Sequence, residues 1–423
     1  MRVKFSGGNK TLEEVYIVDY LRSPFSRSRP AEPEKDVFNK VYMPDVAAML
    51  VNKIIERTGI NPEDIGDVVT GCTMQMKENW LYGGRVINML AGLPMNVAAQ
   101  AIDRVCISAM SAIHRGAMEI MTGYSDVFFA CGIEHMTHLP MQLDLNPHIG
   151  VSPSLMKPEF VQKYDLLTAM SMGLTAEKLF AKYKDKYGWT KRDLDEFAVR
   201  SHQLAAKALK EGYFRNGAGY PQGRKEGEII PVEAEMPDGT KRIIDSDQSI
   251  RPDTTLEAVE KLRPAFKPDG VITAGNSSPL NAGATAMLLM SKKKMKEYGL
   301  EPMARIVSMG WAGVDPSVMG EGPVPATQMA LKHAKLEVKD IDFWEINEAF
   351  TVVTLYAIKA LGLDKDKVNV KGGATAIGHP LGSTGVRITG TLARILQIEN
   401  GRYGCATLCG GGGQGGATII ERV

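Results

Sequence analysis

Residues 103–132 read DRVCISAMSAIHRGAMEIMTGYSDVFFACG, and this stretch decides the fold. The residues before it, from Val97 to Val105, are mostly apolar or small, as a buried strand would be. Small residues then open a run that ends at Gly123 and carries apolar side chains at helical spacing, at Met110, Ile113, Ala117 and Ile120. The pattern predicts a strand followed directly by a helix, with Cys106 at the junction.

Cys106 has two interpretations. In the first turn of a helix its thiol would face unpaired backbone N–H groups and the positive end of the helix dipole, which favour the thiolate. Such a thiol is a candidate nucleophile. An isolated cysteine beside an apolar helix is also typical of a small buried hydrophobic residue, and this stretch alone favours that interpretation. Both interpretations nevertheless stay open.

The composition excludes several classes of protein. With 423 residues, 50 Lys+Arg and 49 Asp+Glu, the chain is large enough for two or more packed units and has a net charge of only +1. That balance argues against a nucleic-acid partner. Five cysteines are too few for a disulfide framework, and we find no signal peptide and no apolar run of membrane-spanning length. These features predict a cytoplasmic protein without a membrane span.

An internal repeat relates the two ends of the chain. Residues 336–347, LEVKDIDFWEIN, match residues 60–71, INPEDIGDVVTG, at an offset of 276 residues. Residues 401–410, GRYGCATLCG, match residues 123–132, GYSDVFFACG, at an offset of 278 residues. Strands alternate with helices in both copies, which predicts a duplicated α/β module with a largely parallel sheet. The helix starts of both halves would then face one crevice.

A different kind of sequence separates the halves. Residues 137–255 are rich in Gly, Pro and charge, and indicate an inserted loop or substrate-binding domain. Helices are expected at 166–183 and 190–210, the second with an N-terminal cap from Thr190 and Asp193. We therefore expect four segments: the first part of the N-terminal half at 1–136, the insertion at 137–255, the completion of the N-terminal half at 256–295, and the C-terminal half at 296–423.

Three further stretches carry groups that could do chemistry. The loop 372–385, GGATAIGHPLGSTG, holds His379, which is either structural or a base for a nearby thiol. Cys409 precedes a glycine-rich run that suits an oxyanion hole; no Lys-Ser/Thr follows, so a phosphate loop of the Walker type is excluded. Asn347 follows an expected strand and could hold a water molecule or a carbonyl oxygen.

The remaining histidines and cysteines predict packing rather than chemistry. His135 and His138 have i, i+3 spacing, but no third ligand is evident nearby, so we expect no metal site. Cys72, Cys131 and Cys405 lie in or beside expected strands and are interpreted as buried packing residues.

Taken together, these motifs resemble the thiolase family, and the match covers essentially the whole chain. Five motifs carry it in the family's order: Cys106-x-Ser108 before a helix, ITAGNSSPLNAG at 272–283, NEAF at 347–350, the His379 loop at 372–385, and CGGGGQGGA at 409–417. Within the family, SAMSAIH, the EHM at 134–136 and the MGLTAE at 172–177 look most like the β-subunit of fatty-acid oxidation trifunctional complexes. The resemblance implies an α/β fold of duplicated βαβαβ modules in a five-layered α-β-α-β-α arrangement with an inserted loop domain.

The resemblance also implies an acyltransferase that cleaves 3-oxoacyl-CoA to acetyl-CoA and a shortened acyl-CoA, or runs the reverse condensation. Cys106 would attack the 3-keto carbon, with His379 helping to form the thiolate. Cys409 would protonate the acetyl-CoA enolate. One oxyanion hole would combine His379 with a water held by Asn347, and the other the N–H groups of Cys106 and Gly411.

For coenzyme A, the positions that match the family are Arg251 near the nucleotide, Ser278 near the pantetheine and Met172 in the acyl channel. CoA is then a substrate, and no metal or permanently bound cofactor is implied. The family suggests a homodimer or homotetramer, and the subfamily likeness a hydratase/dehydrogenase α-subunit as partner. The chain departs from common family residues at Asp103, Ala109, Ser171, Ala258 and Ala282.

Two other functions are alternatives to this one. A decarboxylating or condensing synthase would use Cys with His plus His or Asn, and retention of Cys409 in its glycine-rich setting argues against it. A silent thiolase-like protein that binds acyl-CoA or lipid would commonly lack one of Cys106, His379 and Cys409, and all three are present.

Overall fold

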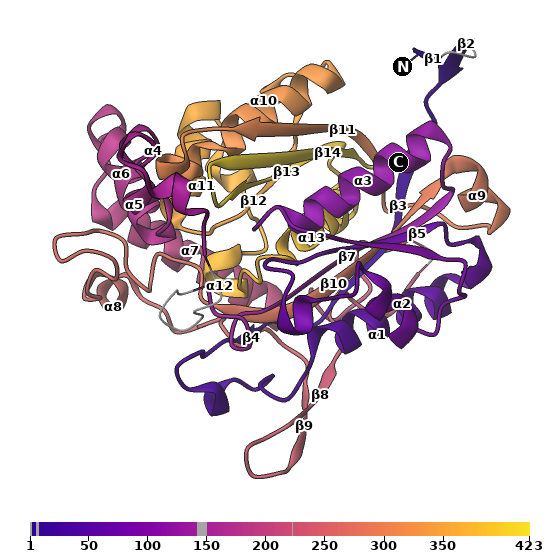
Figure 1. The fold of residues 1–423 in the computed structure, drawn as a ribbon, viewed down its shortest axis with the longest axis horizontal. Coiled ribbons are helices and arrows are strands. Elements are labelled where there is room, and N and C mark those ends of the chain that lie inside the picture. The colour runs from indigo at the N-terminus through magenta and orange to yellow at the C-terminus, as the bar shows by residue number, and fades with distance from the viewer. Residues whose placement is uncertain (1, 6–7, 142–149, 222) are drawn as a thin grey trace.

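A computed structural model describes residues 2–5, 8–141, 150–221 and 223–423. Within these residues ten strands form one sheet in the order β12-β13-β14-β11-β3-β10-β7-β5-β6, with β4 paired to β10 (Figure 1). Their bounds are β3 (Val15–Arg22), β4 (Ser26–Arg27), β5 (Asp67–Gly71), β6 (Ala98–Ile102), β7 (Val127–His135), β10 (Asn281–Ser291), β11 (Ala304–Gly313), β12 (Phe343–Ile346), β13 (Tyr403–Gly410) and β14 (Gln414–Glu421).

The sheet consists of two halves with the same strand order. The order β3-β10-β7-β5-β6 in the first half corresponds to β11-β14-β13-β12 in the second, where a parallel bridge between Trp344 and Val368 takes the place of β6. The halves join through β3 and β11, with Ala304 opposite Ile17. This order confirms the duplicated module.

The expectation of a largely parallel sheet is wrong. β5 pairs in parallel with β6 and β7, and β12 with β13, but β10 and β14 run antiparallel to their neighbours. The reason lies in the connections: β14 follows β13 after a three-residue glycine turn, and so short a turn can join only antiparallel strands.

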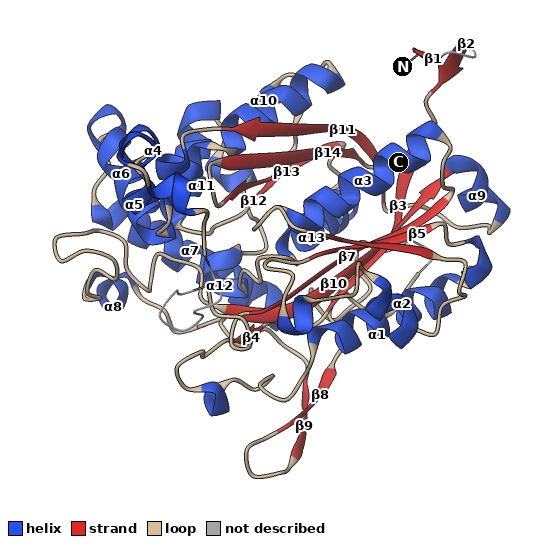
Figure 2. Cartoon of the chain, viewed as in Figure 1, coloured by secondary structure: helices blue, strands red, loops and turns tan. Residues whose placement is uncertain are grey.

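Helices cover both faces of the sheet and fill the space between its halves (Figure 2). The first half packs its outer face against α1 (Met43–Thr58) and α2 (Arg85–Leu90), and the second against α10 (Pro323–Ala334) and α11 (Thr351–Leu361). Between the halves lie α3 (Ser108–Thr122) and α13 (Thr384–Ile398). The layers therefore follow the expected α-β-α-β-α arrangement. Among the described helices, none is both long enough and apolar enough to cross a membrane.

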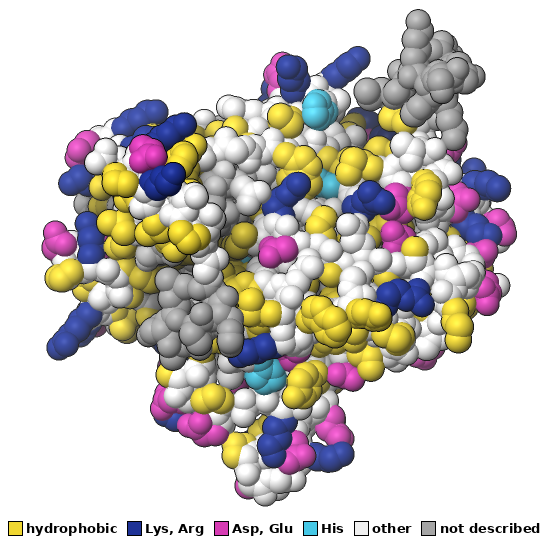
Figure 3. Space-filling model, in the orientation of Figure 1, with side chains coloured by type: hydrophobic (Ala, Val, Ile, Leu, Met, Phe, Trp, Pro, Cys, Tyr) yellow, Lys and Arg dark blue, Asp and Glu magenta, His cyan; other side chains and the backbone are white. Residues whose placement is uncertain are grey.

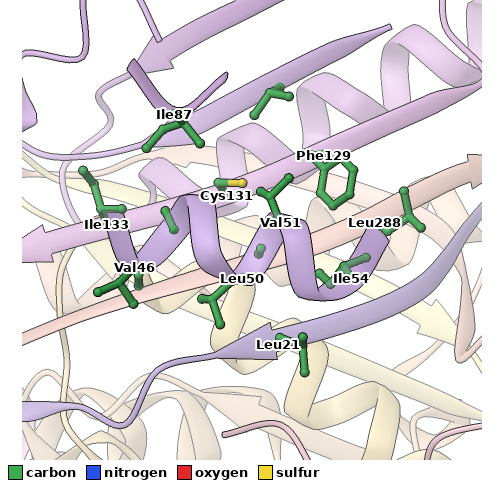
Figure 4. Packing of buried hydrophobic residues seen from close by; sticks show 14 of the residues in the cluster. Leu21, Val46, Leu50, Val51, Ile54, Ile87, Phe129, Cys131, Ile133 and Leu288 are labelled. Carbon is green, nitrogen blue, oxygen red and sulfur yellow. The ribbon is translucent and has the colours of Figure 1, made fainter. Parts of the chain in front are cut away.

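The outer layer of the first half follows from the apolar face of α1. Val46, Leu50 and Ile54 point from α1 toward β7 and β10, where Cys131 and Leu288 meet them (Figure 4). Apolar residues at this spacing form one stripe of a helix, and burying that stripe stabilises both elements. Cys131 lies in this layer, so its interpretation as a packing residue is confirmed.

The central layer depends on main-chain contact between α3 and α13. A Cβ built on Gly385 at the start of α13 would lie 2.2 Å from the backbone nitrogen of Met110 in α3. Only glycine permits this approach. The predicted helix end is confirmed as well, because Gly123 adopts a left-handed conformation directly after α3. The helix starts of the two halves are thus held side by side.

The segment between the halves adds helices and a hairpin that projects from the body (Figure 1). The expected helix at 166–183 is wrong: α5 ends at Ala169 and α6 begins at Met172, because Ser171 is extended. The Thr190–Asp193 capping box is confirmed. Residues 142–149 and 222 of this segment lie outside the described residues, and the four segment boundaries stay a prediction. The elements are α4 (Pro158–Tyr164), α5 (Leu166–Ala169), α6 (Met172–Tyr187), α7 (Lys191–Lys210), β8 (Val232–Glu235) and β9 (Lys241–Ile244).

Short elements complete the chain. The N-terminal hairpin consists of β1 (Arg2–Phe5) and β2 (Gly8–Thr11). Three short helices are α8 (Leu256–Glu260), α9 (Lys292–Glu297) and α12 (Ala374–Ile377). The 3-10 turns are η1 (Pro33–Lys35), η2 (Pro62–Asp64), η3 (Lys77–Asn79), η4 (Pro153–Met156), η5 (Pro316–Glu321), η6 (Val338–Asp340) and η7 (Lys365–Lys367).

A buried ion network ties the inserted segment to the sheet. Arg22 of β3 pairs with Glu228 at 2.7 Å and with Asp247 at 2.6 Å, and Arg394 of α13 pairs with Glu228 at 2.9 Å. All four side chains are fully buried. Removing one partner of such a group leaves an uncompensated buried charge, so the network fixes one arrangement of insertion and core.

Candidate active site

The turn before α3 presents Cys106. Asp103 Oδ1 accepts a hydrogen bond from Val105 N at 2.8 Å. Ser108 Oγ accepts from Arg104 N at 2.8 Å and donates to Val105 O at 2.6 Å. These bonds hold Val105 at a φ of +50°, which is unusual for a β-branched residue. Strain of this kind persists only where the surroundings enforce it, and it fixes the direction in which Cys106 leaves the turn.

Cys106 is buried, with 5% of its surface exposed. It packs in a small apolar cluster with Met136, directly after β7, and with Leu381, from the His379 loop, and Val105 lies against the cluster. The second half of the chain therefore supplies a direct neighbour of the candidate nucleophile.

The surroundings of Cys106 disfavour its charged form. Burial raises the pKa of the thiol to about 12, although the N–H groups of Gly411 and of Cys106 itself act in the opposite direction, and the carboxylates of Glu134 and Asp103 raise the pKa further. The expectation that the helix start favours the thiolate is therefore wrong for this structure. Cys106 precedes α3, which begins at Ser108, and the cost of burying a charge outweighs the backbone dipoles.

His379 is held at three of its nitrogen atoms. Its backbone N donates to Asn281 Oδ1 at 2.8 Å, its Nδ1 lies 2.6 Å from Thr384 Oγ1, and its Nε2 lies 3.3 Å from Asn347 Nδ2. Burial lowers the pKa of His379 to about 3, with a further contribution from Arg387. The imidazole is therefore neutral and fixed in orientation.

The residue before His379 must be glycine. Gly378 has a φ of +118°, and a Cβ there would lie 2.7 Å from Asn281 Cγ. Asn281 also donates through Nδ2 to Ser26 O at 2.6 Å, which anchors its amide to the N-terminal half. The loop reaches Asn281 only because no side chain intervenes.

Cys409 and the glycine turn approach the turn of Cys106. Cys409 is the last residue but one of β13 and is fully buried. Burial raises the pKa of its thiol, and the neighbouring Cys106 raises it further. A Cβ built on Gly411 would lie 3.2 Å from Val105 Cγ1 and 3.5 Å from Met172 Sδ. The structure thus brings Cys106, Cys409, Gly411 and Met172 into one neighbourhood.

Asn347 lies at the carboxyl end of β12, where its backbone N donates to Thr407 O at 3.0 Å. Its Oδ1 is buried and makes no hydrogen bond within the described residues. A buried amide oxygen of this kind is available to an added polar group.

Glu348, the next residue, connects three parts of the chain. It accepts hydrogen bonds from Ser201 Oγ at 2.7 Å, Asn369 Nδ2 at 2.7 Å and Thr375 N at 3.0 Å. A Cβ on Gly373 would collide with its carboxylate at 2.1 Å. Glu348 therefore links helix α7 of the inserted segment to the loop that carries His379.

Two of the sequence-predicted positions take no part in these contacts. Arg251 is exposed, and its backbone N donates to His202 Nδ1 at 3.3 Å. Ser278 is half-buried, and its backbone N donates to Ala349 O at 3.0 Å, one residue before Phe350. Neither side chain joins the hydrogen bonds that surround His379.

Glu78, His135 and His138 form a compact cluster, so the expectation that no third group lies near the two histidines is wrong. The cluster does not have the character of a metal site. His138 Nδ1 faces Glu78 Oε2 at 2.9 Å, and its Nε2 faces Asn39 O at 2.8 Å. Both partners are acceptors, so His138 carries both protons and offers no lone pair to a metal.

The sequence interpretation missed the residues that orient His379. Asn281 lies inside the motif ITAGNSSPLNAG, and Thr384 follows His379 by five residues, as the first residue of the next helix. Their motifs marked the region, but nothing in the spacing showed which side chain would reach the histidine.

Comparison with known proteins extends over nearly the whole chain. Residues 15–293 match the family described as thiolase, N-terminal domain, and residues 300–422 match thiolase, C-terminal domain. The chain is 44% identical over 417 residues to a 3-ketoacyl-CoA thiolase of Marinobacter nauticus, covering 97% of this chain and 98% of that protein. Human mitochondrial 3-ketoacyl-CoA thiolase superposes with a TM-score of 0.83 at 34% identity, covering 98% of this chain and 100% of that one. The same human enzyme in complex with CoA gives a TM-score of 0.83 at 33% identity, covering 98% and 99% of the two chains.

Proposed function

Because this chain belongs to the thiolase family, we propose that Cys106, His379 and Cys409 carry out its acyl transfer. The protein is a CoA-dependent acyltransferase that cleaves 3-oxoacyl-CoA with CoA, a reaction of fatty-acid β-oxidation. CoA is a substrate, and no permanently bound cofactor takes part. The observation that supports the roles of the three residues is that Leu381 of the His379 loop packs on Cys106, and that Cys106 is near enough to Cys409 to raise the pKa of the Cys409 thiol beyond the effect of burial.

In the first half-reaction Cys106 gives its thiol proton to His379 Nε2, and its sulfur attacks C3 of the substrate. The oxyanion at C3 then collapses and the C2–C3 bond breaks, so the electron pair passes to C2 as an acetyl-CoA enolate. Cys409 gives its thiol proton to C2. Acetyl-CoA leaves, and acylated Cys106, the Cys409 thiolate and protonated His379 remain. A neutral thiol and a neutral imidazole are the starting states that this step requires.

In the second half-reaction the thiol of an incoming CoA gives its proton to the Cys409 thiolate and attacks the Cys106 thioester. The tetrahedral oxyanion collapses with breakage of the bond between the acyl carbon and Cys106 Sγ. Cys106 takes back the proton held by His379, and the shortened acyl-CoA leaves. All three residues return to their starting states.

Two groups of donors would stabilise the oxyanions. The N–H groups of Cys106 and Gly411 lower the pKa of the Cys106 thiol, against the larger effect of burial, and so lie near the sulfur beside which the oxygen of a bound acyl group would develop charge. His379 Nε2, once protonated, would form the other hole with a water molecule held by Asn347, whose Oδ1 is free to accept a hydrogen bond.

The CoA contacts follow from position. We assign the acyl channel to Met172, which lies beside Gly411. The exposed Arg251 suits the phosphates of the nucleotide, and the half-buried Ser278 suits the pantetheine arm, because an ionic group stays in water while the thiol end enters the buried site.

The test is turnover of acetoacetyl-CoA and of longer 3-oxoacyl-CoAs with free CoA, followed as loss of the 3-oxo thioester. Without CoA, mass spectrometry should find the shortened acyl group on Cys106 alone. Absence of turnover at every chain length would reject the function. Undiminished turnover in Cys106→Ala would reject the mechanism. The same panel gives the chain-length preference.

We also propose that the chain forms a homodimer or homotetramer through the sheet edge at β6. Large apolar side chains gather near α2 (Figure 3): Trp80, Tyr82 and Met95 are 60%, 64% and 93% exposed. β6 lies at the end of the strand order, so one of its two edges has no neighbouring strand among the described residues. An exposed edge flanked by apolar side chains is what proteins avoid unless a partner covers it.

Light scattering of the purified chain tests this proposal. A dimer or tetramer that becomes monomeric in Met95→Lys would support it. A monomeric wild-type chain would overturn it and leave the face to a different partner, for which a hydratase/dehydrogenase α-subunit is the candidate.

We place the protein in the cytoplasm because its chemistry needs two neighbouring thiols in reduced form. All five cysteines are free, and Cys106 lies close to Cys409. A reducing compartment keeps such a pair from oxidising. Fractionation of cells that carry a tagged copy would test the location.

A further inference from the structure

Glu134, near the end of β7, is a buried carboxylate that accepts four hydrogen bonds. It is 1% exposed. Its Oε2 accepts from Thr73 Oγ1 at 2.7 Å, from Thr73 N at 3.3 Å and from Gly382 N at 3.0 Å. Its Oε1 accepts from Asn79 Nδ2 at 2.9 Å. One carboxylate therefore binds both the loop 73–79 and the main chain of the His379 loop.

The bond to Gly382 lies where the two halves of the chain touch through main chain. A Cβ on Gly382 would lie 2.3 Å from Ile133 O and 2.6 Å from Cys72 Cα, and a Cβ on Gly132 would lie 2.5 Å from Gly382 O. No side chain fits into this contact, so Glu134 reaches across it from one strand to bind the N–H of Gly382.

This contact is three residues from His379 and one from Leu381, which packs on Cys106. Asn281, Thr384 and Asn347 fix the orientation of the histidine, but they do not belong to the turn or the strand that frame Cys106. Glu134 does, because it lies in β7, and Met136, directly after β7, belongs to the Cys106 cluster.

From this geometry we propose that Glu134 is a positioning residue, which holds the His379 loop in register with the turn that carries Cys106. The inference rests on the roles given to Cys106 and His379 above. Glu134 acts through the main chain at Gly382. This role requires a hydrogen-bond acceptor on a side chain of the right length, whereas the negative charge of Glu134 is dispensable.

The charge has a cost for the nucleophile. The ionisable groups that face Glu134 are Cys106 and Cys72. Burial is the largest cause of the raised pKa of both thiols, and the carboxylates of Glu134 and Asp103 raise it further. Burial raises the pKa of Glu134 itself to about 7, against the four hydrogen bonds that lower it. The negative charge of Glu134 thus disfavours the thiolate of Cys106. We therefore expect the value of this carboxylate to lie in the hydrogen bonds that it accepts.

Two conservative variants separate acceptor length from charge. Glu134→Gln keeps the length and one carbonyl oxygen for Thr73 and Gly382. Its new amide group can donate to Asn79 Oδ1, which is buried and makes no hydrogen bond within the described residues, once the Asn79 amide turns over. That turn gives up the bond from Asn79 Nδ2 to Thr73 O at 2.8 Å. Glu134→Asp keeps the charge but is one methylene shorter and cannot span the same gap.

We expect Glu134→Gln to keep kcat within about fivefold of wild type and Glu134→Asp to lose about 100-fold, with KM for 3-oxoacyl-CoA changed little in both, because loss of alignment acts on the chemical step. Alkylation of Cys106 by iodoacetamide, followed by mass spectrometry, should occur at lower pH in the glutamine variant than in wild type, since a neighbouring negative charge is gone.

The opposite order of kcat, with aspartate active and glutamine inactive, would overturn the proposal, as would equal activity of both variants. The matched control is Glu119→Gln, a buried carboxylate at the far end of α3 that pairs with Arg115 and should leave kcat unchanged. Alkylation needs no turnover. A wild-type protein that turns over no substrate would therefore reject the proposed function, whereas an unshifted alkylation profile in the glutamine variant would reject the account of Glu134.

Discussion

The seam between α3 and α13 gives the sharpest link between fold and chemistry, and Gly385→Ala tests it. The added Cβ would lie 2.2 Å from Met110 N and 2.7 Å from Met110 Cβ, whereas ordinary contacts begin at 3.4 Å. The helices must therefore separate by about 1 Å, at an overpacking cost of about 3 kcal/mol. The higher helix propensity of alanine returns about 1 kcal/mol. We expect a net loss of about 2 kcal/mol in the free energy of unfolding.

The same displacement should reduce catalysis, because α3 follows Cys106 and α13 follows His379. A misplacement of about 1 Å between reacting groups costs on the order of 100-fold in kcat. Urea unfolding at fixed protein concentration measures the first effect, and thioester cleavage at saturating substrate the second. The control is Gly313→Ala at the exposed end of β11, where a Cβ meets nothing within 4 Å. Full activity in Gly385→Ala would refute the reasoning, and so would a loss of stability without a loss of kcat.

Three further predictions follow from the site and its surroundings. Cys131→Ala, at the repeat partner of Cys409, should cost about 1 to 2 kcal/mol in unfolding free energy and leave kcat within about twofold of wild type. Cys409→Ala should instead lower kcat by more than about 1,000-fold. Comparable kcat values in the two variants would contradict their different roles. Asn281→Ala should lower kcat by about tenfold or more at nearly constant KM, because His379 N loses its acceptor; steady-state kinetics that show only a raised KM would argue against it. Burial lowers the pKa of His114 to about 3 in the folded chain, whereas an unfolded histidine has a pKa of about 6.5. Below about pH 6.5 the unfolded chain therefore takes up a proton that the folded chain does not, and the free energy of unfolding decreases as the pH is lowered. His114→Gln keeps a hydrogen-bond partner for Thr418 but cannot take up this proton. Between pH 7 and pH 5 its free energy of unfolding, measured by urea titration, should therefore decrease by about 2 kcal/mol less than that of wild type.

Local patterns predicted most single elements. The apolar stripe and the glycine stop of α3 predicted where this helix ends, because the left-handed Gly123 ends it. The internal repeat predicted the matching strands β7 and β13. Where the prediction was wrong, the contacts that decide the structure join residues far apart in the sequence. The antiparallel direction of β10 depends on the return of the chain from the inserted segment. The break at Ser171 depends on the packing of α6 against η5 and α11.

For the candidate site, motifs identified residue types but not partners. The sequence pointed to Cys106, His379, Cys409 and Asn347, to which we assign the reaction. It could not show that Asn281 binds the backbone of His379, because 98 residues separate them. It also gave the wrong direction for the pKa of Cys106, since helix position is local information and burial is not.

The sequence by itself determined the duplicated α/β module, the strand-to-helix junction at residues 103–132 and the set of groups available for acyl transfer. These depend on periodicity, glycine positions and residue chemistry, which are written along the chain. Only the tertiary structure decided how the two halves meet: the main-chain contacts at Gly385 and Gly382, and the reach of Glu134 from one half to the other. Such contacts join residues far apart in sequence through glycines and single hydrogen bonds, and their geometry exists only once both sheets and the helices between them are packed.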